Sequence, residues 1–126
     1  MNVVKINFDG DLCFTGSSDK KVNVIDSHSG ELLGNFVCKG ATKTIDITKD
    51  SKYLYTASLN SIIECFDIST KQHIGAMVRS SKCKYMELSY SNKYMLVYYE
   101  SMLKGGDAVI KVYETEVLNS YLRLYQ

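Results

Sequence analysis

The chain has 126 residues, of which 45% are hydrophobic and 23% are charged, and its net charge at pH 7 is +1. This length fits one domain, the composition is typical of a folded soluble protein, and the charge is too small to draw the chain to nucleic acid or membrane. No apolar run approaches the roughly 18 residues of a membrane span, and the N-terminus lacks the basic and apolar regions of a signal peptide. We therefore expect a cytoplasmic protein with no membrane partner.

The first forty residues contain four short runs that are rich in β-branched and aromatic residues. They lie near Val3–Phe8, Leu12–Ser17, Lys21–Asp26 and Glu31–Val37, and clusters of Asp, Ser and Gly separate them. Residues of these types favour strands, and the polar clusters favour turns. The pattern predicts four consecutive antiparallel strands.

The same pattern of residues returns 41 positions later along the chain. The second copy keeps a serine followed by a turn residue, an aspartate that closes the third run, and a glycine in the fourth run. These matched pairs are Ser17 and Ser58, Asp19 and Asn60, Asp26 and Asp67, and Gly34 and Gly75. A third copy follows, with Met86 and Leu88 in the places of Ile45 and Ile47.

The third copy requires six extra residues within Glu100–Ala108, after which Val109–Glu114 aligns with Ile62–Asp67. The same offset places Tyr121–Leu124 over Ile74–Met77 and predicts a fourth strand there. We expect the segment Met102–Asp107 to be a mobile excursion, because Gly105 and Gly106 give it conformational freedom.

A four-stranded unit of about 40–45 residues that ends in a Trp-Asp-like dipeptide resembles a blade of a WD-repeat β-propeller. The sequence therefore predicts an all-β fold with three four-stranded blades, at about residues 1–38, 40–78 and 82–126. Closed propellers have about 4–8 blades, so three form an incomplete ring. Either the chain is a fragment, or a second copy completes the ring by self-association.

The resemblance to WD blades also gives four residues a structural role. In such blades a serine or threonine on the second strand and an aspartate in the following tight turn join a buried hydrogen-bond network. Ser17 with Asp19, and Ser58 with Asn60, match these places. The third copy departs from the pattern, since Tyr99 stands where the serine belongs.

Within the WD-repeat proteins, the chain is similar to the family of subunit i of eukaryotic translation initiation factor 3. Gly10–Phe36 resembles the first blade of that family, above all in "SHSGELLGNF" at Ser27–Phe36, and Thr44–Ser58 resembles the second. Ile25 and the dipeptide Gly40-Ala41 depart from the family pattern. A WD adaptor associated with kinase receptors shares the blade pattern and is the alternative relative.

The family resemblance implies a non-catalytic scaffold for protein–protein assembly during translation initiation. It implies subunits b and g of the factor as partners and an indirect contact with the small ribosomal subunit. The alternative is a generic WD adaptor in signalling or RNA–protein assembly.

Residues that could carry catalysis or bind a cofactor or metal are not grouped in the sequence. The four cysteines form no CxxC pair and have no histidine nearby, and we interpret them as packing residues. His28 and His73 are predicted to lie in solvated turns, and "KGGDA" lacks the spacing of a phosphate-binding loop. We expect no enzyme, no cofactor and no metal.

Two further expectations concern surfaces. Lysine alternates with tyrosine in Lys82–Tyr99, a combination found in single-strand binders, but strands whose tyrosines fill blade faces explain it better. A stack of three blades leaves its two outer faces without a neighbour. Residues on strands whose faces should meet a neighbour are Leu12, Phe14, Tyr94, Leu96 and Tyr98.

Overall fold

The computed structural model describes residues 3–78, 82–100 and 108–123, which form eleven strands and one helix. The predicted insertion Met102–Asp107 lies outside these residues. The elements are β1 (Val3–Ile6), β2 (Leu12–Gly16), β3 (Lys21–Asp26), β4 (Leu32–Val37), β5 (Thr42–Ile47), β6 (Tyr53–Ser58), β7 (Ile62–Asp67), β8 (His73–Val78), β9 (Cys83–Leu88), β10 (Tyr94–Tyr99), β11 (Val109–Glu114) and α1 (Thr115–Arg123).

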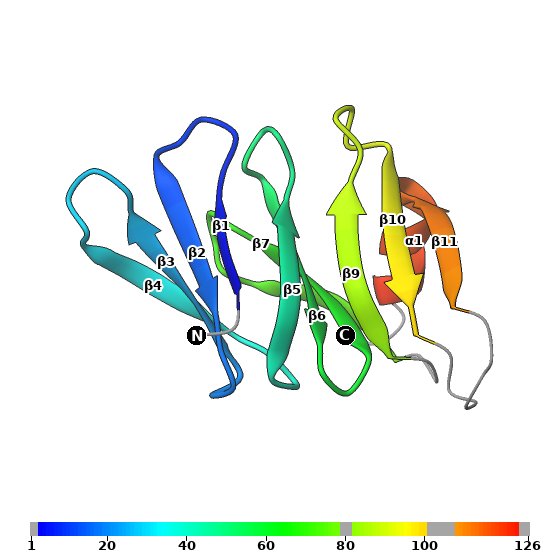
Figure 1. The fold of residues 1–126 in the computed structure, drawn as a ribbon. Helices are drawn as coiled ribbons and strands as arrows, with labels where there is room; N and C mark the ends of the chain where they lie inside the picture. Colours follow the sequence, from blue (N-terminus) through cyan, green and yellow to red (C-terminus); the bar gives the residue numbers. More distant parts are fainter. Residues whose placement is uncertain (1–2, 79–81, 101–107, 124–126) are drawn as a thin grey trace.

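The strands form three antiparallel sheets in sequence order, which we call blades. Blade one is β1–β4 and blade two is β5–β8, each with its strands in consecutive order, and blade three is β9–β11. Figure 1 shows the three sheets side by side, and β1 contacts β5 as β5 contacts β9. This arrangement confirms the all-β propeller-blade fold.

The backbone repeats with the same period of 41 residues as the sequence. A residue with positive φ stands at the same place in the first turn of each blade, at Gly10, Ser51 and Asn92. The second turns of blades one and two place Lys20 and Ser61 in this conformation. Such residues are uncommon outside glycine, so their regular recurrence reflects equivalent tight turns.

Two hydrophobic clusters hold the three blades together. One lies between blades one and two and is centred on Phe36, whose ring lies 6.3 Å from that of Phe14 and 5.4 Å from that of Phe66. The other lies between blades two and three and includes Ile63, Met86 and residues of α1. Blade two is therefore covered on both faces, which is the condition for stability of a two-sided apolar sheet.

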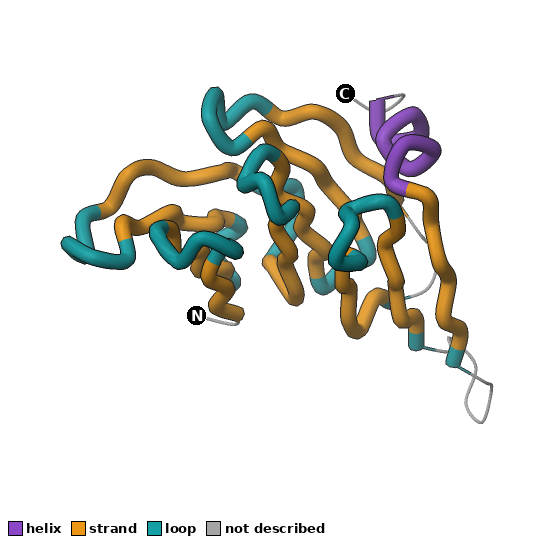
Figure 2. Tube along the Cα trace, turned by 90° about the horizontal axis from the view of Figure 1, so that it is seen from above, coloured by secondary structure: helices purple, strands orange, loops and turns teal. Residues whose placement is uncertain are grey.

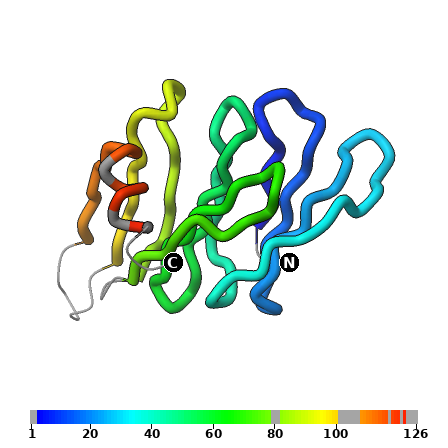
Figure 3. The backbone as a smooth tube through the Cα atoms, turned by 180° about the vertical axis from the view of Figure 1, so that it is seen from behind, coloured from blue at the N-terminus to red at the C-terminus, as the bar shows by residue number. Residues whose placement is uncertain are grey.

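Blade three departs from the prediction, because a helix follows β11 in place of the fourth strand expected at Tyr121–Leu124. The helix α1 packs against β8 and β7 of blade two. Figures 2 and 3 show the helix at the C-terminal end of the row of sheets. Leu118 and Leu122 are fully buried there, and the hydroxyl of Tyr55 donates to Asn119 Oδ1 at 2.7 Å. The prediction of a fourth strand was therefore wrong.

The residues that make the turn in the other blades are replaced in blade three. Its equivalent of the turn-forming Asp67 is Glu114, whose longer side chain is less suited to cap the turn. Leu118 stands at the place where Lys71 has positive φ, a conformation that a large side chain disfavours. Leu118 and Leu122 are four residues apart, a spacing that aligns them on one helix face.

Candidate functional site

The structure brings together each predicted serine and turn residue. The Ser17 hydroxyl donates to Asp19 Oδ1, and the Ser58 hydroxyl donates to Asn60 Oδ1. Asp19 also accepts the backbone N–H of Lys21 at 3.1 Å. The contacts from Ser17 and Lys21 lower the pKa of the Asp19 carboxyl. Each pair thus closes the turn between the second and third strands of its blade.

These pairs lie at the surface of the blade rather than in its interior. Asp19 and Asn60 are exposed, and of the four residues only Ser58 is buried. The expectation of a buried network therefore fails for the turn residues. In blade two, buried Gly40 packs directly on Ser58 and Asn60, so that a side chain at position 40 would collide with both.

The aspartates of the Trp-Asp-like dipeptides cap the turn between the third and fourth strands of blades one and two. Asp26 Oδ1 accepts the N–H groups of His28 and Ser29 at 2.9 and 3.0 Å. Asp67 Oδ1 accepts the N–H of Thr70 at 3.1 Å and the Ser69 hydroxyl. These hydrogen bonds favour the ionised carboxylate and lower the pKa of both aspartates. Both are structural residues.

Glu64 is a fully buried carboxylate that sequence reasoning missed. Its Oε2 lies 2.9 Å from His73 Nε2, and its Oε1 accepts the N–H of Lys39 at 2.8 Å. His73 lies at the start of β8 and is half-buried, so its predicted place in a solvated turn was wrong. The hint in the sequence was a glutamate in the middle of the apolar run Ile62–Asp67, since buried charges need partners.

Polar side chains connect each blade with the next. Asp46 Oδ2 on β5 accepts the N–H of Leu88 on β9 at 2.7 Å. The turns are linked as well, since Asn7 Nδ2 donates to Ser51 Oγ at 2.8 Å, and the Lys49 N–H donates to Asn92 Oδ1 at 3.0 Å. Ser51 and Asn92 are equivalent by the 41-residue period. These contacts fix the stacking of the blades.

The described residues contain neither a reactive thiol nor a group of side chains that could bind a metal ion. None of the four cysteines forms a disulfide, and burial raises the pKa of the Cys38 and Cys83 thiols to about 11, which keeps them protonated at neutral pH. No three metal-binding side chains gather within residues 3–78, 82–100 and 108–123. Over the same residues, no helix has the length and apolar character to cross a membrane.

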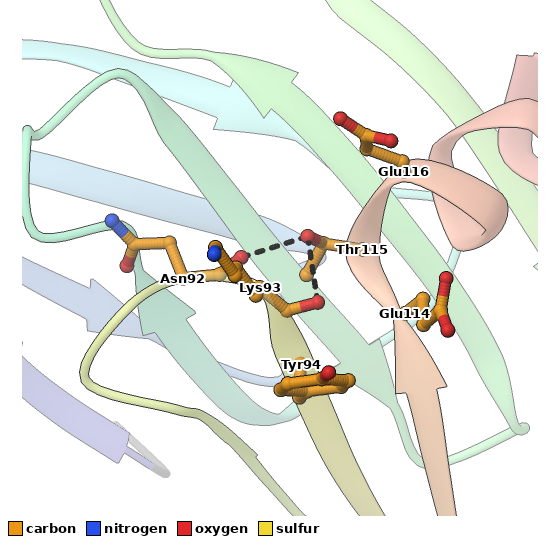
Figure 4. Close-up of a pocket in the computed structure, with 6 residues that line it drawn as sticks. All are labelled: Asn92, Lys93, Tyr94, Glu114, Thr115 and Glu116. Carbon is orange, nitrogen blue, oxygen red and sulfur yellow. Dashed lines mark hydrogen bonds between the residues drawn. The ribbon is translucent and has the colours of Figure 1, made fainter.

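A pocket of about 410 Å³ lies where the turn between β9 and β10 meets the start of α1 (Figure 4). The Thr115 hydroxyl donates to the Asn92 carbonyl there at 2.7 Å. The lining residues are Asn92, Lys93, Tyr94, Glu114, Thr115 and Glu116. None of them is buried, and they combine one cation with two carboxylates, so the pocket favours no particular class of ligand.

Exposed aromatic side chains gather at the end of the stack that carries the first turn of each blade. Phe8 and Tyr90 occupy equivalent places in blades one and three, and their ring centroids are 5.9 Å apart in an edge-to-face arrangement. They are 60% and 76% exposed. Exposed aromatic side chains are common anchors of protein interfaces.

Comparison with known proteins places the chain near one family of translation factors. It is 32% identical to eukaryotic translation initiation factor 3 subunit I of Dictyostelium discoideum over 88% of the chain, and 33% identical to that of Saccharomyces cerevisiae strain S288c over 90%. It is 28% identical to that of Schizosaccharomyces pombe over 93% of the chain. These similarities confirm the resemblance that the blade motifs predicted.

The chain spans about a third of the length of these curated relatives, 33%, 33% and 36% respectively. No family model matches it. Among solved structures, hydrazine synthase of Kuenenia stuttgartiensis superimposes with a TM-score of 0.80 over 90% of this chain and 32% of that chain, at 20% identity. At this identity the similarity concerns the fold alone.

Proposed function

We propose that this chain, which resembles subunit I of eukaryotic translation initiation factor 3, is a non-catalytic scaffold subunit of that complex. It would mediate protein–protein assembly during translation initiation in the cytoplasm. The observation that carries the proposal is the similarity to subunit I from an amoeba and two yeasts over about 90% of the chain.

A scaffold role agrees with how the buried polar groups are used. Glu64 and Asp46 are the buried carboxylates of the described residues, and both are engaged by N–H groups or by His73. The turn aspartates Asp26 and Asp67 are capped by backbone groups. A general acid, base or nucleophile needs a side chain that is free to react, and these residues are committed to the fold.

The proposed partners are subunits b and g of the factor, with an indirect contact to the small ribosomal subunit. Propellers bind partners through the loops at the ends of their blades, and Phe8 and Tyr90 are exposed on such loops. We assign these two aromatic residues to the contact with another subunit, because large exposed rings contribute strongly to protein interfaces.

Affinity purification of the tagged chain from its source cell, with nuclease treatment, tests this function. We expect initiation-factor subunits to be recovered with the chain, and the chain to sediment with small ribosomal subunits. Recovery of signalling or RNA–protein assembly components without initiation factors would favour the generic WD adaptor and contradict the proposal.

Paired variants test the aromatic contact separately. The double variant Phe8→Ser, Tyr90→Ser should recover few of the factor subunits in the affinity purification. Its thermal melting curve should stay cooperative, which shows that the variant is folded. Leu59→Ser is the matched control, since Leu59 is 51% exposed in the turn between β6 and β7, at the other end of the stack. Equal recovery with the double variant and the control would show that the partners bind elsewhere.

A further inference from the structure

The two ends of the row of blades differ in charge. The lower end in Figure 1 holds the turns between β2 and β3 and between β6 and β7, the segment between β4 and β5, and the start of β9. We call it the lysine end, because its described residues include six lysines and two carboxylates. The lysines are Lys20, Lys21, Lys39, Lys43, Lys82 and Lys84. The turns at the opposite end, with the strand residues next to them, carry more carboxylates than lysines.

All six lysines are exposed, and most of them have no carboxylate partner. Lys84 Nζ lies 3.6 Å from Glu100 Oε2. The other carboxylate, Asp19, is held in its own turn by the Ser17 hydroxyl and the N–H of Lys21. Within the described residues, no carboxylate oxygen comes within 4.0 Å of the side-chain nitrogen of the other five lysines. Unpaired surface lysines that lie together attract anionic groups.

Backbone hydrogen bonds hold the segments that carry these lysines in place. The Cys38 N–H donates to the Lys20 carbonyl at 2.7 Å, which brings the segment between β4 and β5 beside the turn between β2 and β3. The Lys39 N–H donates at 2.8 Å to Oε1 of the buried Glu64. Lys43 is the second residue of β5. The charges of blades one and two therefore belong to one continuous surface.

The centre of this surface does not depend on how many blades the whole protein has. Lys39 and Lys43 belong to blade two, which already has a blade on each side. Further blades would stack beyond blade one or blade three, and they would cover the faces of those sheets. The ends of the blades in a propeller carry loops that stay accessible in the closed ring. The lysine end of blade two is therefore a surface of the complete ring as well.

An exposed aliphatic side chain lies at the same end of blade two. Val78 ends β8 and is 66% exposed, although its blade is flanked on both sides. It lies opposite half-buried Ile62 in the register of β7 and β8. The parts of blade two at this end, residues 38–43, 57–62 and 76–78, contain no aromatic residue. Single-stranded nucleic acids are bound largely by stacking on aromatic rings, so these residues favour a peptide over RNA.

We infer that the lysine end binds an acidic segment of a partner protein that also carries aliphatic side chains. Lys39 and Lys43 pair with its carboxylates, and Val78 contacts its aliphatic groups. Complementary charge of this kind speeds association and selects the partner. A second copy of this chain fits less well, because Asp26 and Asp67 at its acidic end already accept backbone N–H groups.

This surface is separate from the contact proposed above for translation. Phe8 and Tyr90 lie on the first turns of blades one and three, which are at the opposite end of the stack. The inference therefore does not rest on the proposed function, and each can fail without the other.

Fluorescence anisotropy with a labelled synthetic peptide of aspartate, glutamate and leucine tests the surface. We expect the peptide to bind, with an affinity that falls as the salt concentration rises, and a version with asparagine and glutamine in place of the acids not to bind. The double variant Lys39→Glu, Lys43→Glu should weaken binding at least about tenfold, since like charges then face each other. Val78→Ser should weaken it less.

The matched control changes the same net charge at the opposite end of the stack. The double variant Lys52→Glu, Lys93→Glu alters two exposed lysines there and should bind the peptide like the unaltered chain. Equal weakening by the two double variants would show that only net charge attracts the peptide, and the inference would be wrong. If the Lys39→Glu, Lys43→Glu variant loses its cooperative melting curve, Lys39→Gln with Lys43→Gln takes its place.

Three further outcomes would overturn the inference. One is that the acidic peptide does not bind at low salt concentration. Another is tighter binding of an oligouridine that carries the same number of negative charges, which would make the surface a site for nucleic acid. The last is a mass above 14.2 kDa in light scattering without peptide that returns to 14.2 kDa in the Lys39→Glu, Lys43→Glu variant, since a second copy would then occupy the surface.

Discussion

His73 Nε2 lies 2.9 Å from Glu64 Oε2, and this pair joins the third and fourth strands of blade two. The second oxygen of Glu64 accepts the N–H of Lys39 from the segment that leads into blade two. The pair therefore ties the outer half of blade two to its junction with blade one. A carboxylate with no exposed surface is stable in this place only because both of its oxygens have partners.

Removal of one partner from the buried carboxylate should be costly. His73→Ala is expected to lower the free energy of unfolding by roughly 3–5 kcal/mol, the usual loss when a buried charge is left unpaired. Glu64→Gln keeps an acceptor for Lys39 and should cost less. Urea denaturation of the two variants checks this order. If the His73→Ala variant keeps its stability, water has taken the place of His73 as a partner of the Glu64 carboxylate, and the prediction is wrong.

The capped turns should make stability depend on acid pH. The pKa of Asp26 and of Asp67 is lowered in the folded chain, so each contributes stability above its unfolded pKa of about 4, and this contribution is lost as the pH falls through the folded pKa. We expect the melting temperature to fall below about pH 4. The Asp67→Asn variant keeps an acceptor oxygen but no ionisable group, so its melting temperature should fall less as the pH is lowered from neutral to about pH 4 and below. Thermal melts over a series of pH values measure this difference. An identical pH profile for the variant would exclude Asp67 as a contributor.

The contact between Asp46 and Leu88 should control how firmly blade three is attached. Asp46→Ala leaves the Leu88 N–H without its acceptor at the junction and should cost roughly 1–3 kcal/mol. Hydrogen exchange measures it directly, since the amide of Leu88 should exchange faster than in the unaltered chain. Amides within blade one serve as the internal control. If amide exchange became faster by the same factor throughout the chain, the substitution would have destabilised the whole fold and not only the junction between blades two and three.

Substitutions at residues 118, 120 and 122 can distinguish the helix after β11 from the fourth strand that the sequence predicted. Leu118→Ala or Leu122→Ala should lower the free energy of unfolding by about 2–5 kcal/mol, since both side chains are fully buried. Ser120 is exposed on the same helix, so Ser120→Ala should be neutral or slightly stabilising through helix propensity. Thermal or urea melts compare the three. In a strand, residues 118, 120 and 122 would share one face, so an equal loss at Ser120 would favour the strand.

The two serine turns should differ in their importance. Ser58 is buried, donates to Asn60 and accepts the N–H of Ile62 at 3.0 Å, so Ser58→Ala should cost roughly 1–3 kcal/mol. Ser17 is half-buried and its partner Asp19 is exposed, so Ser17→Ala should lower the melting temperature less. Thermal melts of the two variants, measured in parallel, check this order. A larger drop in melting temperature for Ser17→Ala than for Ser58→Ala would contradict the prediction that burial decides the cost.

The sequence predicted the strands of blades one and two closely, because these strands depend on local residue choice. The run near Leu12–Ser17 became β2 (Leu12–Gly16), and Lys21–Asp26 became β3 with the same bounds. The spacing of 41 residues also predicted which turns are equivalent. The fourth strand of blade three was mispredicted because the offset was extended past the end of β11, although Glu114 and Leu118 no longer suit a turn there.

The sequence by itself determined the repeat, and the strand order and turns of blades one and two, since each depends on residues that are close in the chain. Only the tertiary structure decided which side chains meet across blades. Asp46 and Leu88 are 42 residues apart, and Tyr55 and Asn119 are 64 apart, and no local pattern pairs them. The same holds for the burial of Glu64 and the exposure of Asp19, because burial depends on which blade covers each face. The physical reason is that strand periodicity fixes which residues share a face, while stacking fixes what that face contacts.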